Sequence, residues 1–263
     1  MLIRDYALAR VLATSLDEKL VPPPDGMHDE QREVELLPRA PGRPPELAIS
    51  TRPVRVPSLA GMCDPAQRAR ILHAFCNHEL QAVELFAWAL LAHPDAPDAY
   101  RRGLLSLLAD EQRHLRLYAA RLAAYGLGFG ELPVSGYFWG KLEGLESPLA
   151  FVCAMCLTFE NANLDHTLDH AQAARAAGDE ATADVLLAVH ADELRHVRFG
   201  LRWLDACRAP CESRVDAYRR AVRWPVRAAL ARGPVLHREA RVAAGLDDEF
   251  LELLERASDR GEA

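Results

Sequence analysis

Cysteines are sparse in this chain, with six among 263 residues. That density is too low for a disulfide scaffold in a chain of this length, so we expect reduced thiols. Long apolar runs are also missing, because the longest uncharged stretch near the centre, Leu85–Ala92, falls far short of the ~20 residues that span a bilayer. Charged residues interrupt the first turns of the chain, which argues against a signal peptide. We therefore expect a soluble, cytoplasmic protein with no membrane partner.

An excess of positive charge is lacking as well. Lysine and arginine total 31 against 38 acidic residues, which gives a net charge of -7. The chain as a whole thus lacks the positive field that nonspecific nucleic-acid binding requires, and nucleic acid is not an expected partner. The hydrophobic content of 50% excludes intrinsic disorder and is enough for a sizeable core.

Prolines are concentrated near the N-terminus, where nine of the 17 lie between Val21 and Pro57. This stretch has no helical periodicity, and it predicts an extended arm that follows a short amphipathic helix over residues 5–20. Leucines and valines in the arm indicate that it packs along the body. A short strand-like alternation occurs around Ala48–Val56.

Long helical patterns begin at Asp64 and are separated by proline and glycine. Ser147 and Pro148, for example, form the N-cap and first-turn pair that starts the third pattern. Tight turns join the first helix to the second and the third to the fourth, whereas a long glycine- and aromatic-rich connection joins the two hairpins. Its segment GFGELPVSGYFWG is a candidate lid. The expected helices cover residues 65–92, 98–125, 147–177 and 180–209.

These patterns predict an all-α protein built on an antiparallel four-helix bundle of two hairpins with a long crossover. We expect three segments: the N-terminal helix and arm over residues 1–63, the bundle over 64–209, and a C-terminal helical extension over 210–263. In the extension we expect Pro225 to kink a helix and DDEFLELLERA to form a final amphipathic helix.

Two hexapeptides nearly repeat within the second and fourth helices, ADEQRH and ADELRH. Each places a glutamate and a histidine three residues apart on one helical face, Glu111 with His114 and Glu193 with His196. The same face carries leucines and valines and therefore points inward. Burying an ionised carboxylate on an apolar stripe is costly unless it is paired or binds a metal. Two such sites indicate a shared cation.

The first and third helices each contribute one glutamate at the matching height, Glu79 and Glu160. Glu79 precedes Glu111 by 32 residues, and Glu160 precedes Glu193 by 33, which indicates an internal duplication of a helical hairpin. Four glutamates and two histidines are the ligand set of a dinuclear site. Carboxylate oxygens with imidazoles suit two iron ions, or manganese or a mixed pair, better than a structural zinc.

This pattern resembles the ferritin-like di-iron carboxylate superfamily, whose order is Glu, Glu-x-x-His, Glu, Glu-x-x-His on four helices. The stretches HELQAVELFAWALLAHPDAP, TFENANLDHTLDH and REARVAAGLDDEF are similar to an uncharacterised bacterial branch of that superfamily, a domain of unknown function. The resemblance implies that Glu79, Glu111, His114, Glu160, Glu193 and His196 bind metal. The chain is longer than a storage ferritin, which argues against a storage cage.

Four further carboxylates lie near the ligands in the sequence. Asp110 and Asp192 each precede a ligand histidine by four residues, and either they accept its N–H and fix its tautomer or they are exposed helix charges. Glu84 and Asp165 follow the ligands of the first and third helices by five residues, so they point off the metal face, and we expect buried salt bridges.

Two other side chains are candidates for catalysis. His190 lies three residues before Glu193, where the duplicate position holds Leu108. It is either a proton donor, a further ligand or a substrate contact, or a core histidine bonded to a carbonyl. Tyr118, one turn beyond His114, either carries an electron hole or is core.

Two remaining patterns have structural interpretations as well as functional ones. Cys153 and Cys156 could act in redox or zinc chemistry, but small buried core residues are the preferred interpretation. Eight arginines between Arg214 and Arg241 form either a surface for a phosphate-bearing partner or a solvated helix face.

The leading functional hypothesis is a di-iron oxidase or oxygenase that activates dioxygen to oxidise or hydroxylate a small-molecule substrate. Its partners would be dioxygen and that substrate, with an electron-donor protein and a second copy of the chain, as a homodimer, as further candidates. Alternatives are a ferroxidase or metal-binding protein without an organic substrate, a tRNA-base hydroxylase, and a scaffold that the metal only stabilises.

Overall fold

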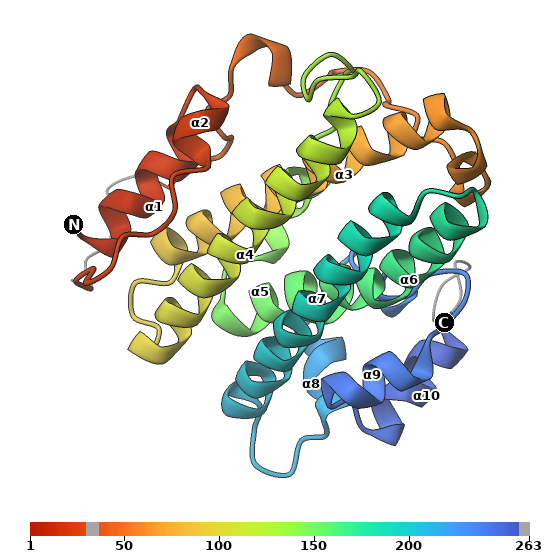
Figure 1. The fold of residues 1–263 in the computed structure, drawn as a ribbon. Coiled ribbons are helices and arrows are strands. Elements are labelled where there is room, and N and C mark those ends of the chain that lie inside the picture. Colours follow the sequence, from red (N-terminus) through yellow and green to blue (C-terminus); the bar gives the residue numbers. More distant parts are fainter. Residues whose placement is uncertain (30–36, 258–263) are drawn as a thin grey trace. The chain divides into compact units, whose positions relative to one another are not determined.

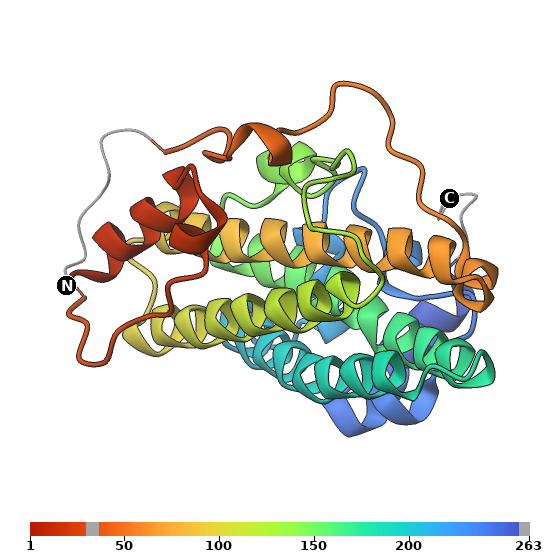
Figure 2. The ribbon, with the colours of Figure 1, turned by 45° about the horizontal axis from the view of Figure 1, so that its top comes forward.

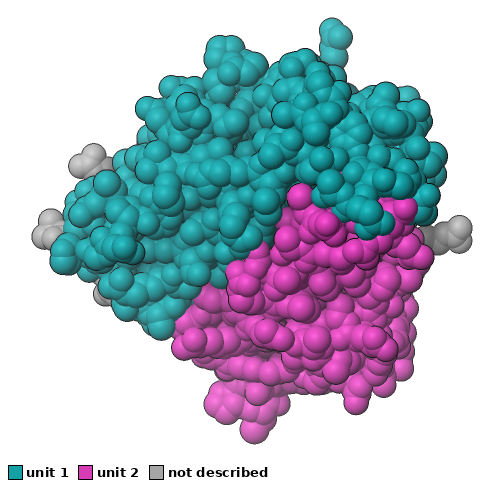
Figure 3. All heavy atoms as spheres, viewed as in Figure 1, with its two compact units in different colours: residues 1–142, 176–181 teal, residues 143–175, 182–263 magenta. Residues whose placement is uncertain are grey.

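A computed structural model describes residues 1–29 and 37–257, so that residues 30–36 of the predicted arm lie outside the described part. Within these ranges the chain forms helices and two isolated β-bridges, and the predicted all-α class is confirmed (Figure 1). The chain divides into two compact units (Figure 3). Unit 1 comprises Met1–Leu142 with Ala176–Ala181, and unit 2 comprises Glu143–Arg175 with Thr182–Ala263.

Unit 1 is built on a long antiparallel hairpin of α3 (Pro65–Ala92) and α4 (Asp98–Ala123), which lie side by side (Figure 2). The Asp64 side chain caps α3 by accepting a hydrogen bond from the Gln67 amide at 2.8 Å. Prolines in the turn between the helices stop α3 at the predicted residue. The hairpin therefore has the predicted form, with α4 two residues shorter at its end.

The predicted N-terminal helix is divided into α1 (Ile3–Leu12) and α2 (Leu16–Lys19). The break occurs because Ser15 caps a new helix, accepting a hydrogen bond from the Glu18 amide at 3.3 Å. The Lys19 ammonium donates to the carbonyls of Arg10 and Val11, each at 3.0 Å. It thereby supplies hydrogen-bond donors to two backbone carbonyls in the last turn of α1.

The arm packs on the α3–α4 hairpin, as predicted. Leu47, in the short 3-10 helix η1 (Pro45–Leu47), is buried with Leu80 and Leu115, and the Trp88 indole donates to the carbonyl of Pro38 at 3.0 Å. Another 3-10 turn, η2 (Leu59–Cys63), leads into α3. The strand-like stretch forms a single bridge, in which the Ser50 amide donates to the Val134 carbonyl at 2.9 Å.

In unit 2 the third helix is not the continuous α-helix that the sequence predicts. It consists of α5 (Pro148–Ala154), a π-helical turn η4 (Met155–Phe159) and α6 (Glu160–Ala176). The Thr158 hydroxyl donates to the Cys153 carbonyl at 2.8 Å. It therefore competes with the backbone amides of the helix for this acceptor. A π-helical turn widens the helix, and Glu160 follows it directly.

The fourth helix, α7 (Glu180–Cys207), approaches the π-helical turn closely at Gly200. A Cβ atom at this position would lie 2.6 Å from the Cβ of Cys156, so no larger residue fits without a shift. Cys153 and Cys156 are buried in the core, in agreement with the preferred interpretation, and none of the six cysteines forms a disulfide.

Short helices follow α7, and their apolar residues, such as Tyr218 and Phe250, share one core with α5, α6 and α7. The predicted kink at Pro225 does not occur because α8 already ends at Ala221 and the next residues are not helical. None of the described helices combines the length and apolarity that crossing a bilayer would take. The elements are α8 (Arg214–Ala221), η5 (Ala228–Ala231), α9 (Arg238–Ala244) and α10 (Asp248–Arg256).

Candidate metal centre

Three of the predicted metal ligands come together in unit 1. Glu79 of α3 and Glu111 and His114 of α4 are all buried, and each offers a ligand atom within 4.8 Å of the others. The Nδ1 atom of His114 lies 3.4 Å from a carboxylate oxygen of Glu111 and 3.8 Å from one of Glu79. Ligand atoms that surround one ion at roughly 2.1 Å lie about 3 Å apart, so this spacing fits a metal.

The electrostatics of this group also fit a cation. Burial raises the pKa of Glu79 well above its ordinary value, and the neighbouring Glu111 carboxylate raises it further. His114, by contrast, lowers the pKa of Glu79. Two carboxylates this close in an apolar interior repel each other, and a divalent ion between them would remove that repulsion.

The other three predicted ligands lie in unit 2 and are also buried: Glu160 at the start of α6, and Glu193 and His196 in α7. The Nδ1 atom of His196 is 3.3 Å from a carboxylate oxygen of Glu193, nearly the 3.4 Å of the corresponding pair in unit 1. The two Glu-x-x-His pairs therefore repeat in geometry as well as in sequence.

Asn163 is a residue of this group that the sequence did not reveal to us. Its side-chain amide donates to Glu160 at 3.2 Å and to Glu193 at 3.0 Å, so one NH2 group holds both carboxylates of unit 2. The signal was present, because Asn163 follows Glu160 by three residues and so shares its helical face.

Asp110 and Asp192 each form an ion pair with the arginine that follows three residues later in the sequence. Arg113 donates to Asp110 at 2.9 Å, and Arg195 contacts Asp192 in the same way. The side chains of both aspartates are largely buried, at 16% and 8% exposure, so neither is a freely solvated charge. Their predicted role in fixing the tautomer of the ligand histidines stays a prediction.

Asp110→Asn and Asp192→Asn should each keep the fold and lower metal affinity by about 10- to 100-fold, because an amide holds an imidazole N–H less firmly than a carboxylate does. Metal titration of the metal-free protein measures this. The matched control is Asp184→Asn, at a side chain of the same helix as Asp192 that is 72% exposed. Unchanged titration curves would show that both aspartates act only in their ion pairs with Arg113 and Arg195.

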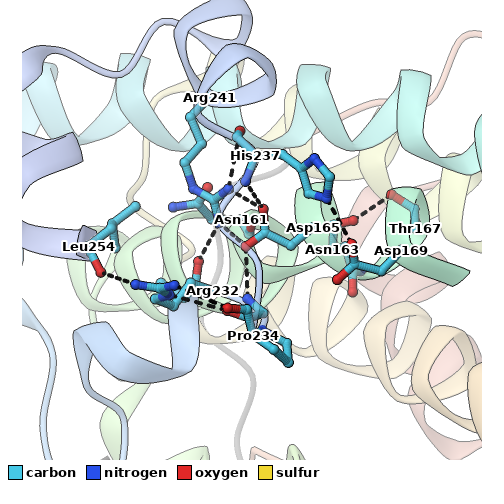
Figure 4. A network of polar contacts seen from close by, with 12 residues as sticks. Asn161, Asn163, Asp165, Thr167, Asp169, Arg232, Pro234, His237, Arg241 and Leu254 are labelled. Atoms are coloured by element: carbon cyan, nitrogen blue, oxygen red, sulfur yellow. Dashed lines mark hydrogen bonds and ion pairs between the residues drawn. The ribbon is translucent and has the colours of Figure 1, made fainter. Parts of the chain in front are cut away.

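Glu84 and Asp165 form buried salt bridges, as predicted. Glu84 lies 3.1 Å from the Lys19 ammonium and 2.7 Å from the Arg43 guanidinium, and it also accepts from the Trp139 indole at 2.7 Å. These contacts tie both α2 and the arm to α3. Asp165 pairs with Arg241, at 2.5 Å and 2.9 Å, and so ties α9 to α6 (Figure 4).

The contacts of His190 define its tautomer. The Thr167 hydroxyl donates its single proton to the Asn163 carbonyl at 2.5 Å, so it must accept from His190 Nδ1 at 2.9 Å. Nδ1 therefore carries the proton, and Nε2 is left as an acceptor. Burial lowers the pKa of His190, with the Glu193 carboxylate opposing this shift, so the ring is neutral near pH 7.

Tyr118 is buried on α4, with its ring centroid 5.3 Å from that of Phe75 on α3.

The crossover, which contains the candidate lid, is hydrogen-bonded to α3. Gln81 accepts from the Phe138 amide at 3.0 Å, and Asn77 donates to the Ser135 carbonyl at 3.0 Å. The crossover ends in η3 (Trp139–Gly144).

Several of the eight arginines from Arg214 onward are neutralised within unit 2. Arg214 pairs with Asp205, Arg220 with Glu212 at 2.7 Å, and Arg238 with two carboxylates. These pairs favour the structural interpretation of the region over a surface for a phosphate-bearing partner.

Fold and site together define an all-helical protein with buried glutamate and histidine clusters that could bind metal. The chain belongs to the family described as "Protein of unknown function (DUF455)", whose model matches residues 6–252. Neither the curated proteins nor the solved structures contain a match to the chain.

Proposed function

We propose that the protein is a ferritin-like dinuclear metal enzyme, with two iron ions as its expected cofactor, that activates dioxygen to oxidise or hydroxylate a small-molecule substrate. The observation that carries the proposal is the repeated ligand geometry. Glu111 with His114 and Glu193 with His196 place the same atoms 3.4 Å and 3.3 Å apart, each pair buried and accompanied by a further glutamate. That one centre uses both groups is proposed from the sequence duplication.

The chain's own groups would have distinct tasks. The four glutamates would neutralise the charge of the metal ions, and the two histidines would supply softer nitrogen ligands. When bound, iron supplies the electrons that reduce dioxygen. Asn163 would fix the orientation of Glu160 and Glu193, because its amide donates to both. The apolar residues that bury these ligands would keep water away.

His190 gives the proposed centre its asymmetry. The corresponding position of the first hairpin holds Leu108, which cannot move a proton. With Nδ1 committed to Thr167, the Nε2 atom of His190 can accept a proton and release it again. Chemistry on a substrate needs such a group, whereas metal storage or a structural metal does not.

His190→Leu should therefore keep the fold and about two metal ions per chain but slow the reaction of the reduced protein with dioxygen by about 100-fold or more, the usual contribution of a positioned acid–base group. Stopped-flow absorbance follows the oxidation, and elemental analysis gives the metal content. Thr167→Val keeps the imidazole but removes its hydrogen bond, so a smaller loss is expected. Unaltered oxidation kinetics in His190→Leu would instead favour a metal-handling protein.

A further inference from the structure

A cavity of about 360 Å³ in unit 1 lies on a different side of α3 from the metal ligands. Ser50 and residues 52–56 of the arm, one face of α3 and residues 132–135 of the crossover line it. His73 lines the cavity and Glu79 does not. Glu79 follows His73 by six positions, which places the two about 120° apart around a helix that turns about 100° per residue. The cavity is thus separate from the ligand group.

The charged groups of this cavity are all positive. Arg52, Arg55 and Arg70 line it, and no aspartate or glutamate does. Among the residues that the structure describes, none of the three guanidinium groups forms an ion pair. Arg102 of the same unit, by contrast, pairs with Asp98 at 2.8 Å. In a protein of net charge -7, such a group of unneutralised arginines creates a local positive potential.

A buried donor lies in the wall of the cavity. His73 is only 3% exposed, and its Nε2 atom accepts from the amides of Gly130 at 3.2 Å and Leu132 at 3.4 Å. Nδ1 must therefore carry the proton, and within the described part of the chain it has no acceptor. Burial lowers the pKa of His73, opposed by Glu131, so the ring stays a neutral donor near pH 7.

The rest of the wall is largely apolar, formed by residues such as Val54, Val56, Leu132 and Val134. The volume is near the lower end of the roughly 300 to 1,000 Å³ typical of small-molecule sites. We propose that this cavity binds a small organic anion, a carboxylate or phosphate on an apolar group, with the arginines and His73 Nδ1 contacting the anion. The proposal goes beyond the metal centre and does not depend on it.

Isothermal titration of the metal-free full chain tests this with four probes: phenyl phosphate, benzoate, inorganic phosphate and benzylamine. We expect phenyl phosphate or benzoate to bind, and whichever binds more tightly identifies the anion. Inorganic phosphate should bind more weakly because it lacks the apolar part, and benzylamine should not bind. Arg55→Gln and Arg70→Gln should each weaken binding about tenfold, as expected for a lost charge-assisted hydrogen bond. Arg102→Gln is the matched control and should change nothing.

Ala74→Leu tests the cavity without changing any charge. Ala74 is a partly exposed lining residue, so a larger side chain there should fill the cavity and weaken binding, with thermal melting checking the fold. Binding that is unaltered in both Arg70→Gln and Ala74→Leu would overturn the proposal. If that unaltered binding were in addition lost in Glu111→Gln, the anion would instead bind at the proposed metal ligands. Metal content has no bearing on either result.

Discussion

Arg241→Met should lower the free energy of unfolding by about 3 to 5 kcal/mol, because it leaves the Asp165 carboxylate charged and buried without its partner. Both side chains are 0% exposed. Arg241 also donates to the carbonyls of Asn161 at 3.1 Å and Ala231 at 3.0 Å, so one side chain joins α6, η5 and α9 (Figure 4). The substitution thus removes a charge pair and two further hydrogen bonds. Urea denaturation followed by circular dichroism measures the change.

Arg238→Met is the matched control for this substitution. Arg238 lies on the same helix and forms two ion pairs of about the same length, 2.8 Å to Asp248 and 2.7 Å to Glu255. Its side chain is 45% exposed, however, and exposed pairs contribute only about 0 to 1 kcal/mol. If both variants lost the same stability, the buried pair would not be what anchors α9.

The helix boundaries of the first hairpin could be predicted from the sequence because local chemistry sets them. Asp64 and Pro65 start α3, and the prolines beyond Ala92 stop it, so no distant contact is needed to define its ends. The same reasoning gave the start of α5 at Ser147 and Pro148. Where the signals are caps and breakers, sequence and structure agree within about two residues.

The π-helical turn before Glu160 could not be predicted in the same way. Its sequence, MCLTF, has ordinary helical residues, and the distortion depends on the Thr158 hydroxyl and on the close approach of Gly200, which is 42 residues past Thr158. Periodicity describes one helix at a time and carries no information on such a neighbour.

The same distinction between local signals and contacts with distant elements applies to the residues of the candidate site. The six proposed ligands follow a regular spacing along helices, so the sequence alone was enough to predict them. Lys19 and Arg43, the partners of Glu84, come from α2 and from the arm, and only the fold brings them to α3. Asn163 lies between these cases, because its spacing from Glu160 was visible but its bond to Glu193 was not. Residues that act through a partner on another element need the structure.

Glu111→Gln and Glu193→Gln should each lose at least one of about two metal ions per chain, because each removes the charge of a buried carboxylate that the proposed centre needs. The substitutions keep the shape of the side chain, so the α4 and α7 helices should persist. Elemental analysis after reconstitution with iron gives the stoichiometry, and thermal melting confirms the fold. The matched control is Glu180→Gln, at an exposed glutamate of the same helix as Glu193, which should keep both ions.

The two variants test different parts of the proposal because Glu111 belongs to unit 1 and Glu193 to unit 2. If a single centre uses both ligand groups, each substitution should also weaken binding of the ion that remains, since both ions would then depend on the charge of the same set of carboxylates. Two independent mononuclear sites would instead lose one ion each and keep the other at its original affinity. Full metal content in both variants would refute the ligand assignment itself, since neither buried carboxylate would then be needed to balance the charge of an ion.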